Sequence, residues 1–129
     1  MFNYVRNLNS STPPEVIKRP IGQNTEAFFG ELMYMENAEL KGGMTKTSPL
    51  YLTLEAKAIG DAKGEISCIR VLPGTVLSAS IDFSASVKNG DGATFYINDD
   101  GRCLSISSDG TDCEVIGTID DFTALIIVN

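Results

Sequence analysis

The sequence contains no histidine and no tryptophan. Without histidine, Ser-His-Asp and Cys-His catalysis and the usual zinc sites are excluded, and the most common general base at neutral pH is missing. An enzyme on this chain would need paired carboxylates, a lysine or a lone thiol. We therefore expect a protein that is not an enzyme and that holds no cofactor and no metal ion.

Long apolar runs are also missing. The longest run, Ala124 to Val128, is far shorter than the roughly 20 residues that a helix needs to cross a bilayer. The first residues lack the basic and then apolar order of a signal peptide. These absences predict a protein without membrane contact that is made in a cytoplasm.

Cysteine is scarce, and the three cysteines are Cys68, Cys103 and Cys113. An odd number cannot form a complete disulfide framework, so we expect buried free thiols that act as small apolar side chains. A disulfide between Cys103 and Cys113 is the alternative.

Positive charge is in short supply, since ten Lys and Arg residues face seventeen Asp and Glu residues and the net charge is −7. Residues 1–25 carry three basic residues and one acidic residue, so their net charge is +2 and that of residues 26–129 is −9. Proteins that read nucleic acid usually present a basic face. We therefore expect no nucleic-acid partner.

What the sequence does contain is strand patterning with a turn signal every 8–12 residues. Leu77, Ala79 and Ile81 begin an apolar alternation that continues to Val87, and serines and Asp82 fill the other face. Further strands are expected at 50–54, 66–72, 93–97, 103–107 and 115–119. A chain of 129 residues with this pattern predicts one all-β domain, a small β-barrel or β-sandwich.

Two segments, 26–41 and 122–128, do not show the simple alternation of a half-buried strand. In residues 26–41, Phe28, Phe29, Leu32 and Met33 fit one helical face, but Gly30 opposes a helix. A strand at residues 32–35 followed by a turn at Asn37-Ala38 is therefore the favoured interpretation. Residues Phe122 to Val128 are apolar on both faces, which predicts a strand that is central or covered by a partner.

Residues 1–25 have no sustained period and contain three of the five prolines. Proline removes backbone donors and favours extended neighbours, so this segment is predicted to be an extended N-terminal arm, with the body at residues 26–129. Its apolar residues either pack on the arm's own domain or dock on a neighbouring subunit. The candidate partner-binding residues of the arm are Phe2, Tyr4, Arg6, Leu8, Val16, Ile17, Lys18 and Arg19.

Carboxylate pairs occur at Asp99-Asp100 and Asp120-Asp121. Both pairs lie in predicted turns, where aspartate bonds the backbone, so turn formation explains them better than catalysis. Residues 98–101 and 109–112 resemble calcium loops but lack the EF-hand spacing and its closing glutamate, and solvated turns are the better account.

Three short motifs resemble the decoration (cement) proteins of tailed-bacteriophage capsids. They are Thr47-Ser48-Pro49-Leu50-Tyr51-Leu52 after a glycine-rich loop, Gly90-Asp91-Gly92-Ala93-Thr94-Phe95-Tyr96, and Val115-Ile116-Gly117-Thr118-Ile119 followed by the apolar segment Ala124 to Val128. The resemblance covers residues 42–129, and residues 26–41 and 76–88 have no counterpart in it.

The resemblance implies a small β-tulip-like barrel or sandwich on the outer face of a phage head. Its partners would be the major capsid protein and neighbouring copies of itself, which includes a possible trimer, and its location would be the virion. The alternative is a carbohydrate- or ligand-binding β-sandwich of a phage tail or cell-surface structure. In that alternative, the stacking platforms would be Tyr34, Tyr51 and Tyr96.

Overall fold

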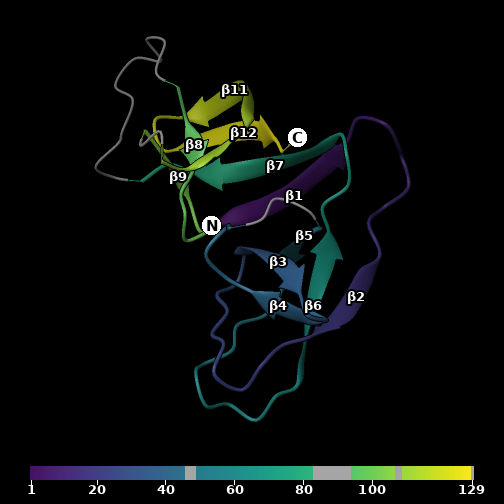
Figure 1. Ribbon diagram of the computed structural model, residues 1–129. Helices are drawn as coiled ribbons and strands as arrows, with labels where there is room; N and C mark the ends of the chain where they lie inside the picture. Colours follow the sequence, from purple (N-terminus) through teal and green to yellow (C-terminus); the bar gives the residue numbers. More distant parts are fainter. Residues whose placement is uncertain (46–48, 83–93, 107–108, 129) are drawn as a thin grey trace.

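The computed structural model describes residues 1–45, 49–82, 94–106 and 109–128, and these residues form an all-β protein (Figure 1). The strands make three antiparallel sheets of five, four and three strands. Within the described part of the chain the sheets do not close into a barrel, and their packing is sandwich-like. The expected all-β class is therefore confirmed.

The largest sheet has five strands in the order β2-β6-β5-β3-β4. Their bounds are β2 Val16–Pro20, β3 Leu32–Glu36, β4 Glu39–Lys41, β5 Leu50–Thr53 and β6 Glu65–Arg70. A tight turn joins β3 to β4, and both of its central residues have positive φ, 51° at Asn37 and 63° at Ala38. This is the backbone of a type I′ hairpin turn. The predicted strand and turn in residues 26–41 are confirmed, and the helical alternative is wrong.

The second sheet has four strands in the order β1-β7-β12-β11. Their bounds are β1 Phe2–Asn7, β7 Thr75–Ser80, β11 Glu114–Asp120 and β12 Thr123–Ile127. The apolar β12 lies between two strands, so its predicted central position is confirmed. The alternation that begins at Leu77 buries Leu77, Ala79 and Ile81. Its continuation over 83–87, and the turn expected at 89–92, lie outside the described residues.

A small third sheet has the order β10-β8-β9, with β8 at Tyr96–Ile97, β9 at Leu104–Ser105 and β10 at Thr111–Asp112. The turn between β8 and β9 passes through Gly101, where φ is +71°. The carbonyl of Gly101 accepts a 2.8 Å hydrogen bond from the amide of Leu32, and a Cβ at residue 101 would collide with the carbonyl of Leu32. Glycine therefore allows this turn to lie against the start of β3.

The main core contains buried side chains from all three sheets, which include Leu32, Leu52, Leu77, Ile97 and Ile126. A second core lies on the opposite face of the five-stranded sheet, because successive residues of a strand point to opposite faces. Its buried members are Ile21, Ala27, Met33, Leu40, Tyr51, Ile66 and Cys68. The five-stranded sheet is therefore covered on both faces.

Residues 1–25 do not form an arm that stands apart from the body. Strand β1 pairs with β7, β2 pairs with β6, and Phe2 is buried in the main core. Figure 1 shows β1 on the side of its sheet that faces the five-stranded sheet. The expected boundary at residue 25 is therefore corrected. Of the two interpretations of the apolar residues, packing on the chain's own domain describes Phe2.

The prolines misled the prediction because edge strands tolerate them. Strand β2 is the outermost strand of its sheet, and Pro20 is its last residue. Proline is tolerated in edge strands and at strand ends, where few ladder hydrogen bonds depend on its missing amide hydrogen. A short edge strand with a proline at its end can therefore have the same local sequence as an extended arm.

The expected free thiols and aspartate turns are confirmed, but burial of the thiol is complete only at Cys68. Cys68 is buried, Cys103 and Cys113 are half-buried, and all three are free thiols. Burial raises the pKa of Cys68 and of Cys113 to about 11. In the turns, Asp100 and Asp120 each accept a hydrogen bond from the amide two residues later, at 2.9 and 2.8 Å.

Candidate functional site

The loop from Ala27 to Gly30 places two adjacent phenylalanines at the surface. Phe28 is 46% exposed and Phe29 is 50% exposed, although the residues on both sides of the pair are buried. Aromatic side chains are enriched in protein interfaces. An exposed pair of this kind is the first feature of the surface that needs an explanation.

The backbone of this loop is held at both ends. Ala27 and Lys57 exchange two amide-to-carbonyl hydrogen bonds of 2.9 Å, and the amide of Gly30 donates to the carbonyl of Thr53 at 2.9 Å. The hydroxyl of Thr53 donates to the carbonyl of Phe28 at 2.5 Å. The two rings are therefore carried by a fixed backbone.

The side chain of Lys57 is almost completely buried and binds the chain just before this loop. Its ammonium group donates to the carbonyls of Gln23, Thr25 and Ala58 at 3.0, 2.9 and 3.3 Å. An ammonium group has three donors, so all three are satisfied without a carboxylate. Lys57 therefore acts as a backbone clamp for residues 23–27.

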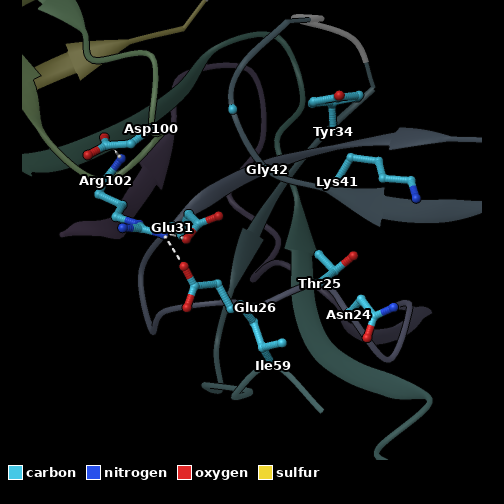
Figure 2. A pocket seen from close by; sticks show the side chains of 11 residues that line it. Asn24, Thr25, Glu26, Glu31, Tyr34, Lys41, Gly42, Ile59, Asp100 and Arg102 are labelled. Atoms are coloured by element: carbon cyan, nitrogen blue, oxygen red, sulfur yellow. Dashed lines mark hydrogen bonds and ion pairs between the residues drawn. The ribbon is translucent and has the colours of Figure 1, made fainter. Parts of the chain in front are cut away.

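Arg102 lies across the ring of Phe28, with its guanidinium carbon 3.9 Å from the ring centroid. Its Nε donates to Oε1 of Glu31 at 3.1 Å, and a terminal nitrogen pairs with Oε1 of Glu26 at 3.4 Å. Figure 2 shows Arg102 reaching from the turn before β9 to both glutamates. We call Phe28, Phe29 and Arg102 the aromatic platform.

Glu31 is the buried member of this network and is 1% exposed. Burial raises the pKa of its carboxyl, and the hydrogen bond from Arg102 opposes that effect. The amide of Phe28 also donates to Oε1 of Glu31, at 3.4 Å. The carboxylate of Glu31 therefore binds both the side chain of Arg102 and the backbone amide of Phe28.

Arg102 lines two hollows. One has a volume of about 460 Å³, and its lining includes the charged side chains of Glu26, Glu31, Lys41 and Asp100 (Figure 2). The other has a volume of about 200 Å³ and lies among Met1, Phe28, Phe29, Gly30 and Arg102. All three platform residues therefore line the smaller hollow, and Arg102 also lines the larger one.

The larger hollow brings three carboxyl groups together, those of Glu26, Glu31 and Asp100. Arg102 pairs with the first two, and Asp100 accepts the amide hydrogen of Arg102. Both glutamates are therefore bound to one guanidinium, and Glu31 is buried. Among the described residues, no cluster of His, Cys, Asp or Glu side chains is suited to a metal ion.

The residues proposed from sequence for partner binding are not brought together. Phe2 is buried, and Tyr4, Ile17 and Arg19 are half-buried. The exposed members are Arg6 on β1, Leu8 in the turn after β1, and Val16 and Lys18 on β2, which belongs to another sheet. Arg19 instead lies over the ring of Tyr51, 5.5 Å from its centroid. The set therefore does not form one surface.

The carbohydrate alternative relied on tyrosines as stacking platforms. Tyr34 and Tyr51 are buried in the two cores, and Tyr96 is half-buried in the small sheet. Tyr34 is 7% exposed and Tyr51 is 5% exposed, so neither ring has enough free surface to stack on a sugar. The expected platform role of Tyr34 and Tyr51 is therefore wrong.

The sequence reasoning missed the platform. Phe28 and Phe29 fit the helical alternative for residues 26–41, and no motif in the sequence singles out Arg102. One signal was present, since two adjacent phenylalanines cannot both point into the core from a strand. No sequence signal shows that Arg102 contacts Phe28, which lies 74 positions earlier in the chain.

No protein-family model, no curated protein and no solved structure matches this chain. In the described part of the chain, no helix is long and apolar enough to span a membrane. The site must therefore be interpreted from its own geometry.

Proposed function

We propose that this chain is a structural binding protein that attaches to a larger protein assembly through its aromatic platform. The observation that carries the proposal is the half-exposed pair Phe28 and Phe29 on a backbone fixed by Thr53 and Lys57. A rigid apolar group loses little conformational entropy when a partner covers it. Arginine beside such aromatic residues is typical of interface hot spots.

The exposed ring area is large enough to matter. Covering half of a phenylalanine side chain, roughly 100 Å², contributes about 2.5 kcal/mol at the usual value per unit of apolar area. Association costs offset part of the sum for two rings. One copy therefore binds with modest affinity, and firm attachment follows when many copies, or several contacts, act together.

The assembly that we propose is the outer surface of a tailed-phage head, on which the chain acts as a decoration protein. The support for this choice is the resemblance of residues 47–52, 90–96 and 115–119 to such proteins, together with the all-β fold. The acidic body, with its net charge of −9 outside residues 1–25, suits a protein that must keep neighbouring particles apart.

Co-sedimentation with empty, expanded capsid shells of the phage that encodes the chain tests the proposal. The wild-type protein is expected to sediment with the shells, and the double variant F28A/F29A is expected to bind at least about tenfold more weakly. The matched control is V5A/L8A, which removes two exposed apolar side chains from β1 and from the turn that follows it.

The control also separates the platform from residues 1–25. If V5A/L8A loses binding while F28A/F29A keeps it, attachment lies with the N-terminal segment and the platform proposal is wrong. If the wild-type protein does not bind shells at all, the capsid assignment is wrong. Circular dichroism of each variant establishes that lost binding does not reflect lost folding.

A further inference from the structure

Strand β11 presents a second apolar surface. It forms one edge of the four-stranded sheet, and β1 forms the opposite edge. Strand β11 pairs with β12 on one side only (Figure 1). Val115, Ile116 and Ile119 are 37%, 38% and 60% exposed. Within the described residues, no strand pairs with the outer edge of β11.

Comparison with the edge strand β2 shows what β11 lacks. Edge strands are usually protected against further pairing by lysine, proline or bulges. Strand β2 carries Lys18 and ends at Pro20, whereas β11 contains neither lysine nor proline. Ile116 and Ile119 are themselves the extra residues of two bulges, which twist β11 but leave both isoleucines exposed. The outer edge of β11 is therefore the less protected of the two.

The charge around β11 indicates what can cover it. Residues 103–129 contain no lysine and no arginine, and their acidic residues are Asp109, Asp112, Glu114, Asp120 and Asp121. Glu114 and Asp120 stand at the two ends of the strand, on either side of the exposed apolar residues. A second copy of β11 would bring like charges together, which destabilises cross-strand pairs. The charge therefore favours a basic partner.

We infer that the outer edge of β11 binds an extended segment of another protein, in which apolar residues alternate with lysine or arginine. Such a segment would add a strand to the sheet, cover Val115, Ile116 and Ile119, and place its basic side chains near Glu114 and Asp120. This inference shares with the proposed function only the premise that the partner is a protein. It does not depend on the platform or on a capsid.

Synthetic peptides test the inference without a capsid, so its failure and that of the proposed function are distinguishable. The probe is a peptide of alternating valine and lysine, titrated into the ¹⁵N-labelled full chain. Matched peptides replace lysine by glutamate or valine by serine. The valine–lysine peptide is expected to shift the amide signals of β11 and β12, and both matched peptides are expected to bind about tenfold more weakly.

Two variants of the chain complete the test. I116S/I119S keeps every charge and removes the exposed apolar side chains, and V5S is the control at an exposed position on the opposite edge strand. Binding should weaken about tenfold in I116S/I119S and stay unchanged in V5S. Equal binding of the serine–lysine peptide would show charge attraction alone, and shifts centred outside β11 would show another site. Either result, or no binding, overturns the inference.

Discussion

Glu31 and Arg102 are 71 positions apart in the chain, and a 3.1 Å hydrogen bond joins the carboxylate of one to the Nε of the other. The bond connects the residue just before β3, a strand of the five-stranded sheet, to the turn that precedes β9. Because Arg102 also lies over Phe28, the same bond sets the position of the platform. A single buried carboxyl group thus couples the packing of the sheets to the surface that we propose for binding.

The raised pKa of Glu31 predicts a pH dependence of stability. In the folded protein, burial holds the pKa of this carboxyl above its ordinary value of 4.5. Between pH 4.5 and the folded pKa, the folded state therefore binds more protons than the unfolded state. The contribution of Glu31 to stability is greatest below pH 4.5 and is lost as the pH rises through the folded pKa.

Urea unfolding of the wild type and of E31Q across pH 4–8 measures this effect. The stability of E31Q relative to the wild type is expected to rise with pH, since glutamine cannot ionise and still offers an oxygen to Arg102. Glu55 is the control, because a hydrogen bond from the amide of Ser67 lowers its pKa. The difference between the wild type and E55Q should change only below pH 4.5, as that bond is lost on acidification. A difference between wild type and E31Q that is independent of pH would contradict the first prediction.

The Thr53 hydroxyl should be needed to hold the platform loop. It accepts a 2.9 Å hydrogen bond from the amide of Glu31 and donates to the carbonyl of Phe28. T53V keeps the shape and leaves both groups without this partner, so we expect a loss of about 1–3 kcal/mol in the free energy of unfolding. T53S retains the hydroxyl and should lose less. A negligible loss in T53V together with a larger loss in T53S would show that the methyl group, not the hydroxyl, stabilises the loop.

Much of the fold follows from local pattern. The alternation of Leu77, Ala79 and Ile81, the two apolar faces of β12 and the Asn37-Ala38 turn could all be predicted, because each is a property of a few consecutive residues. A period of two reports which face of a strand is buried. It does not report which strand lies beside it.

The integration of residues 1–25 could not be predicted for that reason. Strand β1 pairs Phe2 with Ala79, a partner 77 positions away, and no local pattern names that partner. The platform escaped prediction in the same way. The sequence shows Phe28 and Phe29 but not whether they are exposed. Their exposure depends on hydrogen bonds to the loop that carries them, and Thr53 and Lys57, which make these bonds, lie 25 or more positions after Phe28 in the chain.

Removal of the Lys57 ammonium group should destabilise the protein strongly. K57M keeps the length of the side chain but leaves the carbonyls of Gln23, Thr25 and Ala58 without this donor. We expect a loss of about 2–4 kcal/mol in the free energy of unfolding, measured in urea. K63M is the control, because Lys63 is exposed and pairs with Glu55 at the surface, and its loss should be within about 0.5 kcal/mol. A K57M loss as small as that of K63M would show that the buried bonds contribute no net stability.

The hairpin between β3 and β4 offers a stabilising substitution. Ala38 is exposed and has a φ of 63°, a conformation that costs an L-residue with a Cβ about 1 kcal/mol or more. A38G removes that cost and creates the Asn-Gly pair that type I′ turns prefer, while the greater freedom of glycine in the unfolded chain offsets part of the gain. We expect the net gain to be about 0.5–1 kcal/mol and the midpoint of thermal unfolding to rise by about 2–5 °C. Asn37 also has a positive φ, but asparagine tolerates it, so N37G should bring no comparable gain. If A38G lowered the midpoint, or if N37G raised it equally, the backbone at Ala38 would not be strained as its φ implies.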